Sequence, residues 1–160
     1  MREKVNKFVG SFLLLLMAIM LIAVLWQVFT RYILGAASTI TEELARFLLI
    51  WIGLLGAAYI SGENMHIAID ILPNRLTGQN KRTLTIFINL IIIAFAVTAL
   101  IIGGSQLVYI TYTLGQTSAA LQIQLAYVYL VIPISGVLIC YYKILDLFKL
   151  DELVESNLQN

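Results

Sequence analysis

Charged side chains gather in a short segment of this 160-residue sequence, where their spacing allows them to interact. Glu42, Glu43 and Arg46 lie together, and the i,i+4 spacing of Glu42 and Arg46 lets them pair on one helix face. Arg31 lies close enough in sequence to join them. Three roles fit such a group: an ion pair at the lipid headgroups that orients a helix, a contact with another membrane subunit, or a proton or ion site.

A second group contains the only histidine. His66 and Asp70 are four residues apart, so on a helix their side chains can meet. Two ligands are too few for a zinc site, and we expect a histidine–carboxylate hydrogen bond that orders the loop. No Gly-rich phosphate loop, Ser–His–acid arrangement or Cys/His cluster is present, so the sequence predicts no enzyme, bound metal or cofactor in this chain.

The elements that position these groups are membrane spans. Residues 83–142 contain no Asp, Glu, Lys or Arg, and 61% of the whole chain is hydrophobic. Because a spanning helix needs about 20 apolar residues, this run alone supplies two spans. We predict an all-α integral membrane protein, with short interfacial helices and one domain over residues 1–160. Its four spans are predicted at about 8–30, 41–62, 83–113 and 124–145.

The positive charges predict the orientation. The two ends and the segment between spans two and three carry eight of the ten Lys and Arg residues. The positive-inside rule therefore predicts that both termini are cytoplasmic. The first span is too long for a typical signal core and is expected to remain as an anchor. The net charge of +1 gives no case for nucleic-acid binding.

Small residues predict close helix packing. Gly53 and Ala57 recur at a spacing of four in the second span, and Gln27 shares a face with Arg31 in the first. In the third span Asn89, Ala96 and Gly103 recur every seven residues, with Gly104 beside the last. The spacing does not say whether the neighbouring helix belongs to this chain or to another.

Two further signals concern helix ends and bends. Thr39 with Glu42 fits a capping box, which predicts that the second helix begins there. Pro133 should interrupt the fourth span, because its ring removes a donor and clashes with the preceding turn.

Several segments resemble the small membrane subunit (Q-type) of tripartite ATP-independent periplasmic (TRAP) transporters. The resemblance covers nearly the whole chain and rests on WQVFTRY at 26–32, TEELAR at 41–46, WIGLLGA at 51–57, HIAIDIL at 66–72 and PISG at 133–136.

This resemblance implies a location in the bacterial inner membrane. It also implies a role as the small scaffold subunit of a sodium-coupled importer of organic acids, such as C4-dicarboxylates, sialic acid or related sugar and keto acids. The partners would be a large elevator-type membrane subunit, which holds the sodium and substrate sites, and a periplasmic substrate-binding protein. Membrane lipids would surround the chain. The residues expected at subunit or lipid-level contacts are Gln27, Arg31, Glu42, Glu43, Arg46, Gly53 and Ala57.

Two alternatives belong to other functional classes. One is a self-sufficient four-helix transporter, such as a dimeric exporter, but that class carries an acid within its first span and here residues 8–30 contain none. The other is a membrane enzyme acting on lipids, for which only Glu42, Glu43 and Arg46 offer a polar cluster.

Overall fold

The computed structural model describes residues 2–35, 38–62 and 79–158, and these form helices and connecting turns without a strand. The elements are α1 (Arg2–Ile33), α2 (Thr39–Gly62), α4 (Gln79–Phe95), the π-helix η1 (Ala96–Gly103), α5 (Gly104–Thr113), α6 (Leu125–Tyr129) and α7 (Val131–Leu158). Four stretches are long and apolar enough to span a membrane: Arg2–Ile33, Thr39–Gly62, Thr83–Thr113 and Leu125–Phe148. The predicted all-α, four-span class is confirmed. The cytoplasmic location of the termini stays a prediction.

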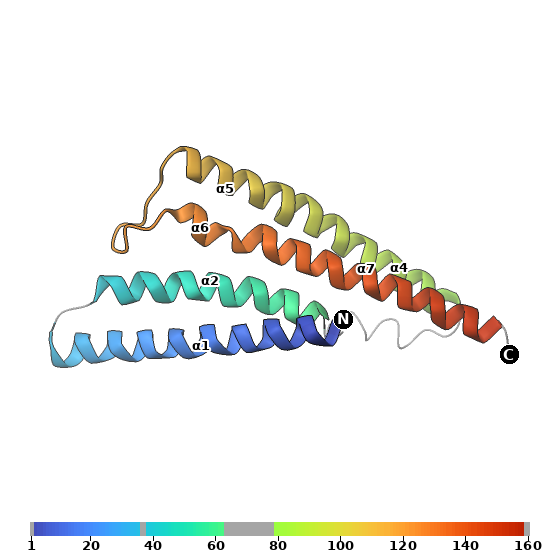
Figure 1. Cartoon of the computed structure of the whole chain (residues 1–160), viewed down its shortest axis with the longest axis horizontal. Helices are drawn as coiled ribbons and strands as arrows, with labels where there is room; N and C mark the ends of the chain where they lie inside the picture. The colour runs from blue at the N-terminus through green and yellow to red at the C-terminus, as the bar shows by residue number, and fades with distance from the viewer. Residues whose placement is uncertain (1, 36–37, 63–78, 159–160) are drawn as a thin grey trace.

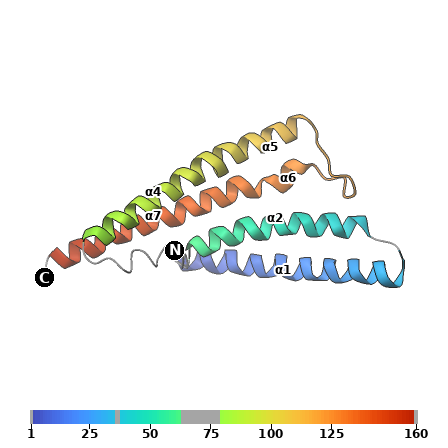
Figure 2. The same cartoon turned by 180° about the vertical axis from the view of Figure 1, so that it is seen from behind.

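The four spans lie side by side in a single row (Figure 1). α1 packs on α2, α2 packs on α7, and α7 packs on the continuous helix formed by α4, η1 and α5. Within the described residues α1 makes no comparable interface with that outer helix. The reverse view shows the same order, and both termini lie toward the same end of the long helices (Figure 2). We call this end of the helices the terminal end and the opposite end the distal end.

An open row buries little side-chain surface. In the most apolar stretch of each span, 39% of residues are buried for Leu125–Phe148 but only 11% for Thr83–Thr113. The third and fourth spans form the second hairpin, which consists of the outer helix (α4, η1 and α5) and of α6 with α7. In this hairpin the fourth span is the more buried, and the outer helix is largely uncovered. Both broad faces of the row remain apolar and exposed, as expected where lipid or another membrane protein covers them.

The ends and bends of the helices follow from local sequence. α2 begins at the predicted Thr39, and the capping contacts come from the preceding Ser38. The Ser38 hydroxyl oxygen accepts a hydrogen bond from the Thr41 N–H at 3.5 Å, and the Ser38 carbonyl accepts one from the Glu42 N–H. The fourth span is interrupted at Leu130, between α6 and α7. This break falls within four residues of Pro133, which lacks the N–H that the Tyr129 carbonyl would accept in a regular helix.

Glycines allow the second hairpin to close. A Cβ placed on Gly136 would lie 2.8 Å from Leu100 Cβ and 2.9 Å from Ile101 Cγ1, both in η1. A Cβ on Gly104 would lie 2.7 Å from Ile132 Cγ2. Ala96 and Asn89 of the predicted stripe are buried, whereas Gly103 is exposed and its neighbour Gly104 makes the contact. Gly136 and Gly104 thus leave room for side chains of the facing helix, those of Leu100 and Ile101 in η1 and of Ile132 in α7.

We expect Gly136→Ala to lower the free energy of unfolding of the detergent-solubilised chain by about 1–3 kcal/mol, because the added methyl group overpacks the α7–η1 contact. Gly53→Ala is the matched control, since a Cβ there meets no atom within 4 Å. Equal unfolding free energies for the two variants would contradict this account of the hairpin.

Candidate functional site

At the distal end, Glu43 binds the loop that joins α5 to α6. Its carboxylate accepts hydrogen bonds from the Ser118 hydroxyl (3.0 Å) and from three consecutive backbone N–H groups, those of Ala119 (3.2 Å), Ala120 (2.8 Å) and Leu121 (3.0 Å). Such charge-assisted bonds are stronger than neutral ones. The Glu43 carboxylate is therefore used within the chain, where it fixes the loop on α2.

The loop is also ordered by its own backbone. The Ser118 N–H donates to the Ile123 carbonyl at 2.8 Å, and Thr117 forms an antiparallel bridge with Gln124. Gln122 closes the turn with a φ of 58°, in the left-handed region. The loop lies between the third and fourth spans that the sequence predicted at 83–113 and 124–145. No local sequence pattern indicates that Glu43, which lies 75 or more residues before this loop, binds it.

Glu42 and Arg46 form the predicted i,i+4 ion pair. Arg46 Nη2 lies 3.1 Å from Glu42 Oε1, and the side chains are 65% and 50% exposed respectively. Exposed pairs of this kind contribute little to stability. Arg31 is exposed at the end of α1, and no ion pair joins it to Glu42 in the part of the chain that the structure describes. A role of Arg31 together with Glu42 and Arg46 stays a prediction.

An uninterrupted exposed face runs along α2. Its members, which we call the α2 outer face, are Glu42, Arg46, Leu49, Gly53, Ala57 and Ile60. They recur at steps of three or four residues and so lie on one side of the helix. Gly53 and Ala57 are both exposed, and a Cβ placed on Gly53 would meet no atom within 4 Å, although their spacing is typical of close helix contacts. Gln27, on α1, is half-buried.

At the terminal end, Arg2 joins three helices. Its Nη1 lies 2.7 Å from Asp146 Oδ1 on α7, and its Nε donates to the Gly62 carbonyl at the end of α2 at 3.0 Å. Arg2 Nη2 donates to the same carbonyl. Lys143 Nζ lies 3.5 Å from the other oxygen of Asp146. The guanidinium thus neutralises both a carboxylate and the negative C-terminus of α2.

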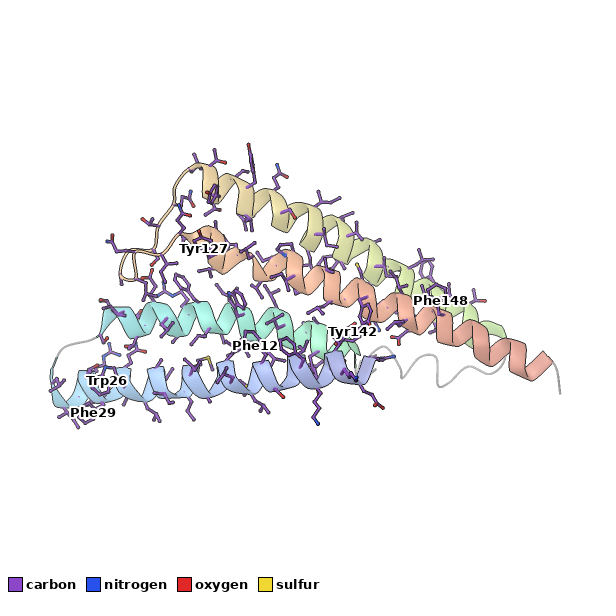
Figure 3. All side chains as sticks on the ribbon, viewed as in Figure 1. Phe12, Trp26, Phe29, Tyr127, Tyr142 and Phe148 are labelled. Carbon is purple, nitrogen blue, oxygen red and sulfur yellow. The ribbon has the colours of Figure 1, made fainter. Side chains whose placement is uncertain are left out.

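Tyr142 completes the same contact (Figure 3). Its side chain is fully buried against Gly62, where a Cβ would come within 2.8 Å of the ring. The Arg2 guanidinium lies 6.0 Å from the ring centroid. No local pattern in the sequence indicates this junction, because Arg2 and Asp146 are 144 residues apart.

A third tie lies between these two. The indole Nε1 of Trp51 donates to the Val128 carbonyl at 3.0 Å, just before the break between α6 and α7. Phe12 packs edge-on against the same indole, with ring centroids 6.5 Å apart. α2 is therefore linked to the second hairpin by polar contacts at three levels. The contacts at its distal end and in its middle are direct, and the one at its terminal end runs through Arg2 of α1.

No three His, Cys, Asp or Glu side chains of the described ranges lie together as a metal site would require. His66 and Asp70, the predicted loop-ordering pair, lie outside the described residues. The placement of Gln27, Arg31, Glu42, Glu43, Arg46, Gly53 and Ala57 at a subunit or lipid contact stays a prediction.

We expect Glu43→Gln to increase hydrogen exchange at the amides of Ala119, Ala120 and Leu121 by roughly tenfold, because the neutral amide is a weaker acceptor. Exchange measured by mass spectrometry on the purified chain checks this. Glu42→Gln should leave those amides unchanged. Unaltered protection in Glu43→Gln would show that the loop is ordered without the carboxylate.

We also expect Arg2 and Asp146 to be energetically coupled. In a double-mutant cycle of Arg2→Gln and Asp146→Asn, the coupling free energy should be about 1–3 kcal/mol, since the two charges are partly buried and in contact. A parallel cycle on Arg46 and Glu42 should give less than about 0.5 kcal/mol, because that pair is exposed. Denaturant unfolding of all variants provides the values, and similar coupling in both cycles would refute the stabilising role of the junction.

Comparison with known proteins places the chain in a family. The family described as "Tripartite ATP-independent periplasmic transporters, DctQ component" matches residues 6–152. The sialic acid TRAP transporter small permease protein SiaQ of Vibrio cholerae is 25% identical over 159 residues, which is 96% of this chain and 87% of that protein.

Other relatives match over shorter parts of their length. A putative TRAP transporter small permease protein of Haemophilus influenzae is 36% identical over 72 residues, 45% of each chain. The isethionate TRAP transporter permease protein DctMQ of Oleidesulfovibrio alaskensis is 32% identical over 146 residues. That match covers 88% of this chain but only 23% of DctMQ. The aligned part is thus less than half of each of these two relatives.

The family is a transporter permease component of the inner membrane and not an enzyme. These matches, together with four spans in an open row, lead to one conclusion: the chain belongs to the DctQ component family of the tripartite ATP-independent periplasmic transporters.

Proposed function

We propose that this chain is the non-transporting frame of a sodium-coupled TRAP importer of organic acids. The observation that carries the proposal is the α2 outer face, where Gly53 and Ala57 lie exposed on an otherwise tied and central helix. Small residues let a neighbouring helix approach closely in a membrane. A transmembrane helix of the large permease subunit is the occupant that the family suggests.

The shape of the chain supports a mechanical role. In a row of helices each added helix widens the footprint in the bilayer, whereas a closed bundle gains less width. The polar ties at both ends and in the middle of α2 prevent the two hairpins from sliding past each other. A moving transport domain needs a fixed frame to move against, and a wide, tied row resists tilting.

The orientation and the outer partner form part of the same proposal. With both termini in the cytoplasm, the distal loop held by Glu43 faces the periplasm, on the side where a substrate-binding protein delivers its cargo. Sodium and substrate would bind in the large subunit. The named relatives serve sialic acid and isethionate systems, and we assign the choice of the acid to the partners.

Stable association with a large subunit is supported by DctMQ. In that permease the segment similar to this chain occupies about a quarter of one longer polypeptide. Covalent joining in a relative suits partners that remain together in a complex, and a small-residue helix face suits a lasting contact within the membrane.

We expect Gly53→Leu or Ala57→Leu to weaken co-purification with the large subunit by at least roughly tenfold, because the bulky side chain separates the helix backbones. Ala18→Leu, an exposed position on α1, is the matched control. Uptake of the organic acid by vesicles should fall in parallel with complex formation. Unchanged complex and uptake would remove the α2 outer face from the interface, and uptake by this chain alone would refute the role as a frame.

A further inference from the structure

An apolar cavity of about 600 Å³ opens between α1 and α7, and residues of α2 and of the outer helix (Ile101 and Ser105) also line it. Phe8 and Phe12 of α1 line one side, Val137 of α7 lines the other, and Trp51 and Leu55 of α2 lie between them. Phe8 is 73% exposed and Val137 is 56% exposed, so the cavity is an open groove. Ser105 is the one hydroxyl-bearing residue among those that line it.

The lining and the location of the groove indicate its occupant. The lining runs from Val5 to Phe12 on α1, which corresponds to about 10 Å along the helix axis. Apart from Ser105, the groove is lined by apolar side chains. Because it lies in a membrane-spanning region, where lipid hydrocarbon surrounds the protein, an acyl chain suits its lining.

One charge at the terminal end defines the headgroup. Lys4 is exposed and precedes Phe8 by four residues, so the two side chains neighbour each other along α1. At about 100° per residue, Glu3 and Lys7 lie about 100° or more around the helix from Phe8. Lysine stems extend along apolar surface and place the ammonium group at the headgroup level. The groove therefore ends beneath a cation whose charge complements a phosphate group.

We propose that this groove is a specific site for an anionic phospholipid of the leaflet on the side of the termini. One acyl chain lies over Trp51, between Phe8 and Val137, and the lipid phosphate pairs with the Lys4 ammonium group. The site depends only on the membrane location of the chain and does not require the proposed frame function. The bound lipid would fill the gap between α1 and α7.

Trp51 provides the measurement. The sequence has two tryptophans, and Trp26→Phe leaves Trp51 as the sole emitter, inside the groove. The full chain is reconstituted in vesicles of phosphatidylethanolamine containing a minor share of phosphatidylglycerol, with bromine on the acyl chains of one lipid or the other. Brominated phosphatidylglycerol should quench Trp51 at a roughly fivefold lower mole fraction than brominated phosphatidylethanolamine.

Matched variants separate the two parts of the site. Val137→Phe fills the groove and should abolish the preferential quenching, whereas Ile144→Phe, at an exposed position of the same helix outside the groove, should retain it. Lys4→Gln should remove the preference for phosphatidylglycerol, and Lys7→Gln should keep it. The two lysine variants leave the apolar lining intact, so they test the proposal even where Val137→Phe fails to fold.

Three results would overturn the proposal. Quenching that follows the bulk mole fraction of either lipid would show that no specific site exists. Equal loss of preference in Lys4→Gln and Lys7→Gln would show general attraction to a charged surface. Loss of lipid quenching when the large subunit is bound, with Trp51 shielded from both brominated lipids, would assign the groove to a protein partner.

Discussion

The absence of a hydrophobic force between helices in lipid is the constraint on which this structure depends. Lipid tails are as apolar as leucine, so helices in a membrane associate through close packing and polar contacts. An open row makes the difficulty greater, because each interface joins only two neighbours. The chain meets it on α2 with three polar ties, at Glu43, Trp51 and the Gly62 carbonyl. Between α7 and η1, a glycine on α7 allows the close packing that holds the two helices together.

The ties differ in their chemistry according to depth. The two that involve full charges lie at the ends of the spans, where a charge can remain near water and headgroups. The tie in the middle is a neutral indole–carbonyl bond, made to a carbonyl next to the helix break at Leu130. The interruption of the fourth span thus has a structural consequence, since backbone groups near a break can accept partners from a neighbouring helix.

Openness gives the chain surfaces of different character. The α2 outer face contains the small residues Gly53 and Ala57 and has an exposed ion pair at one end, which suits another helix. The groove between α1 and α7 is apolar and is bordered by Lys4, which suits an anionic lipid. A closed four-helix bundle would have buried both surfaces in its own core.

The sequence by itself determined the fold class, the spans and the charge-pair spacing. Hydropathy over 20 residues is a local property, and so is the i,i+4 geometry that joins Glu42 to Arg46. The order of helices in the row, the inward role of Glu43 and the Arg2–Asp146 junction were decided only by the tertiary structure. These contacts join residues 75 to 144 positions apart, and in a uniformly apolar sequence no periodicity reports which helix faces meet. Gly53 and Gly136 show the limit most directly: both are glycines within a spanning helix, yet a Cβ on Gly53 would meet no atom within 4 Å and a Cβ on Gly136 would lie 2.8 Å from Leu100.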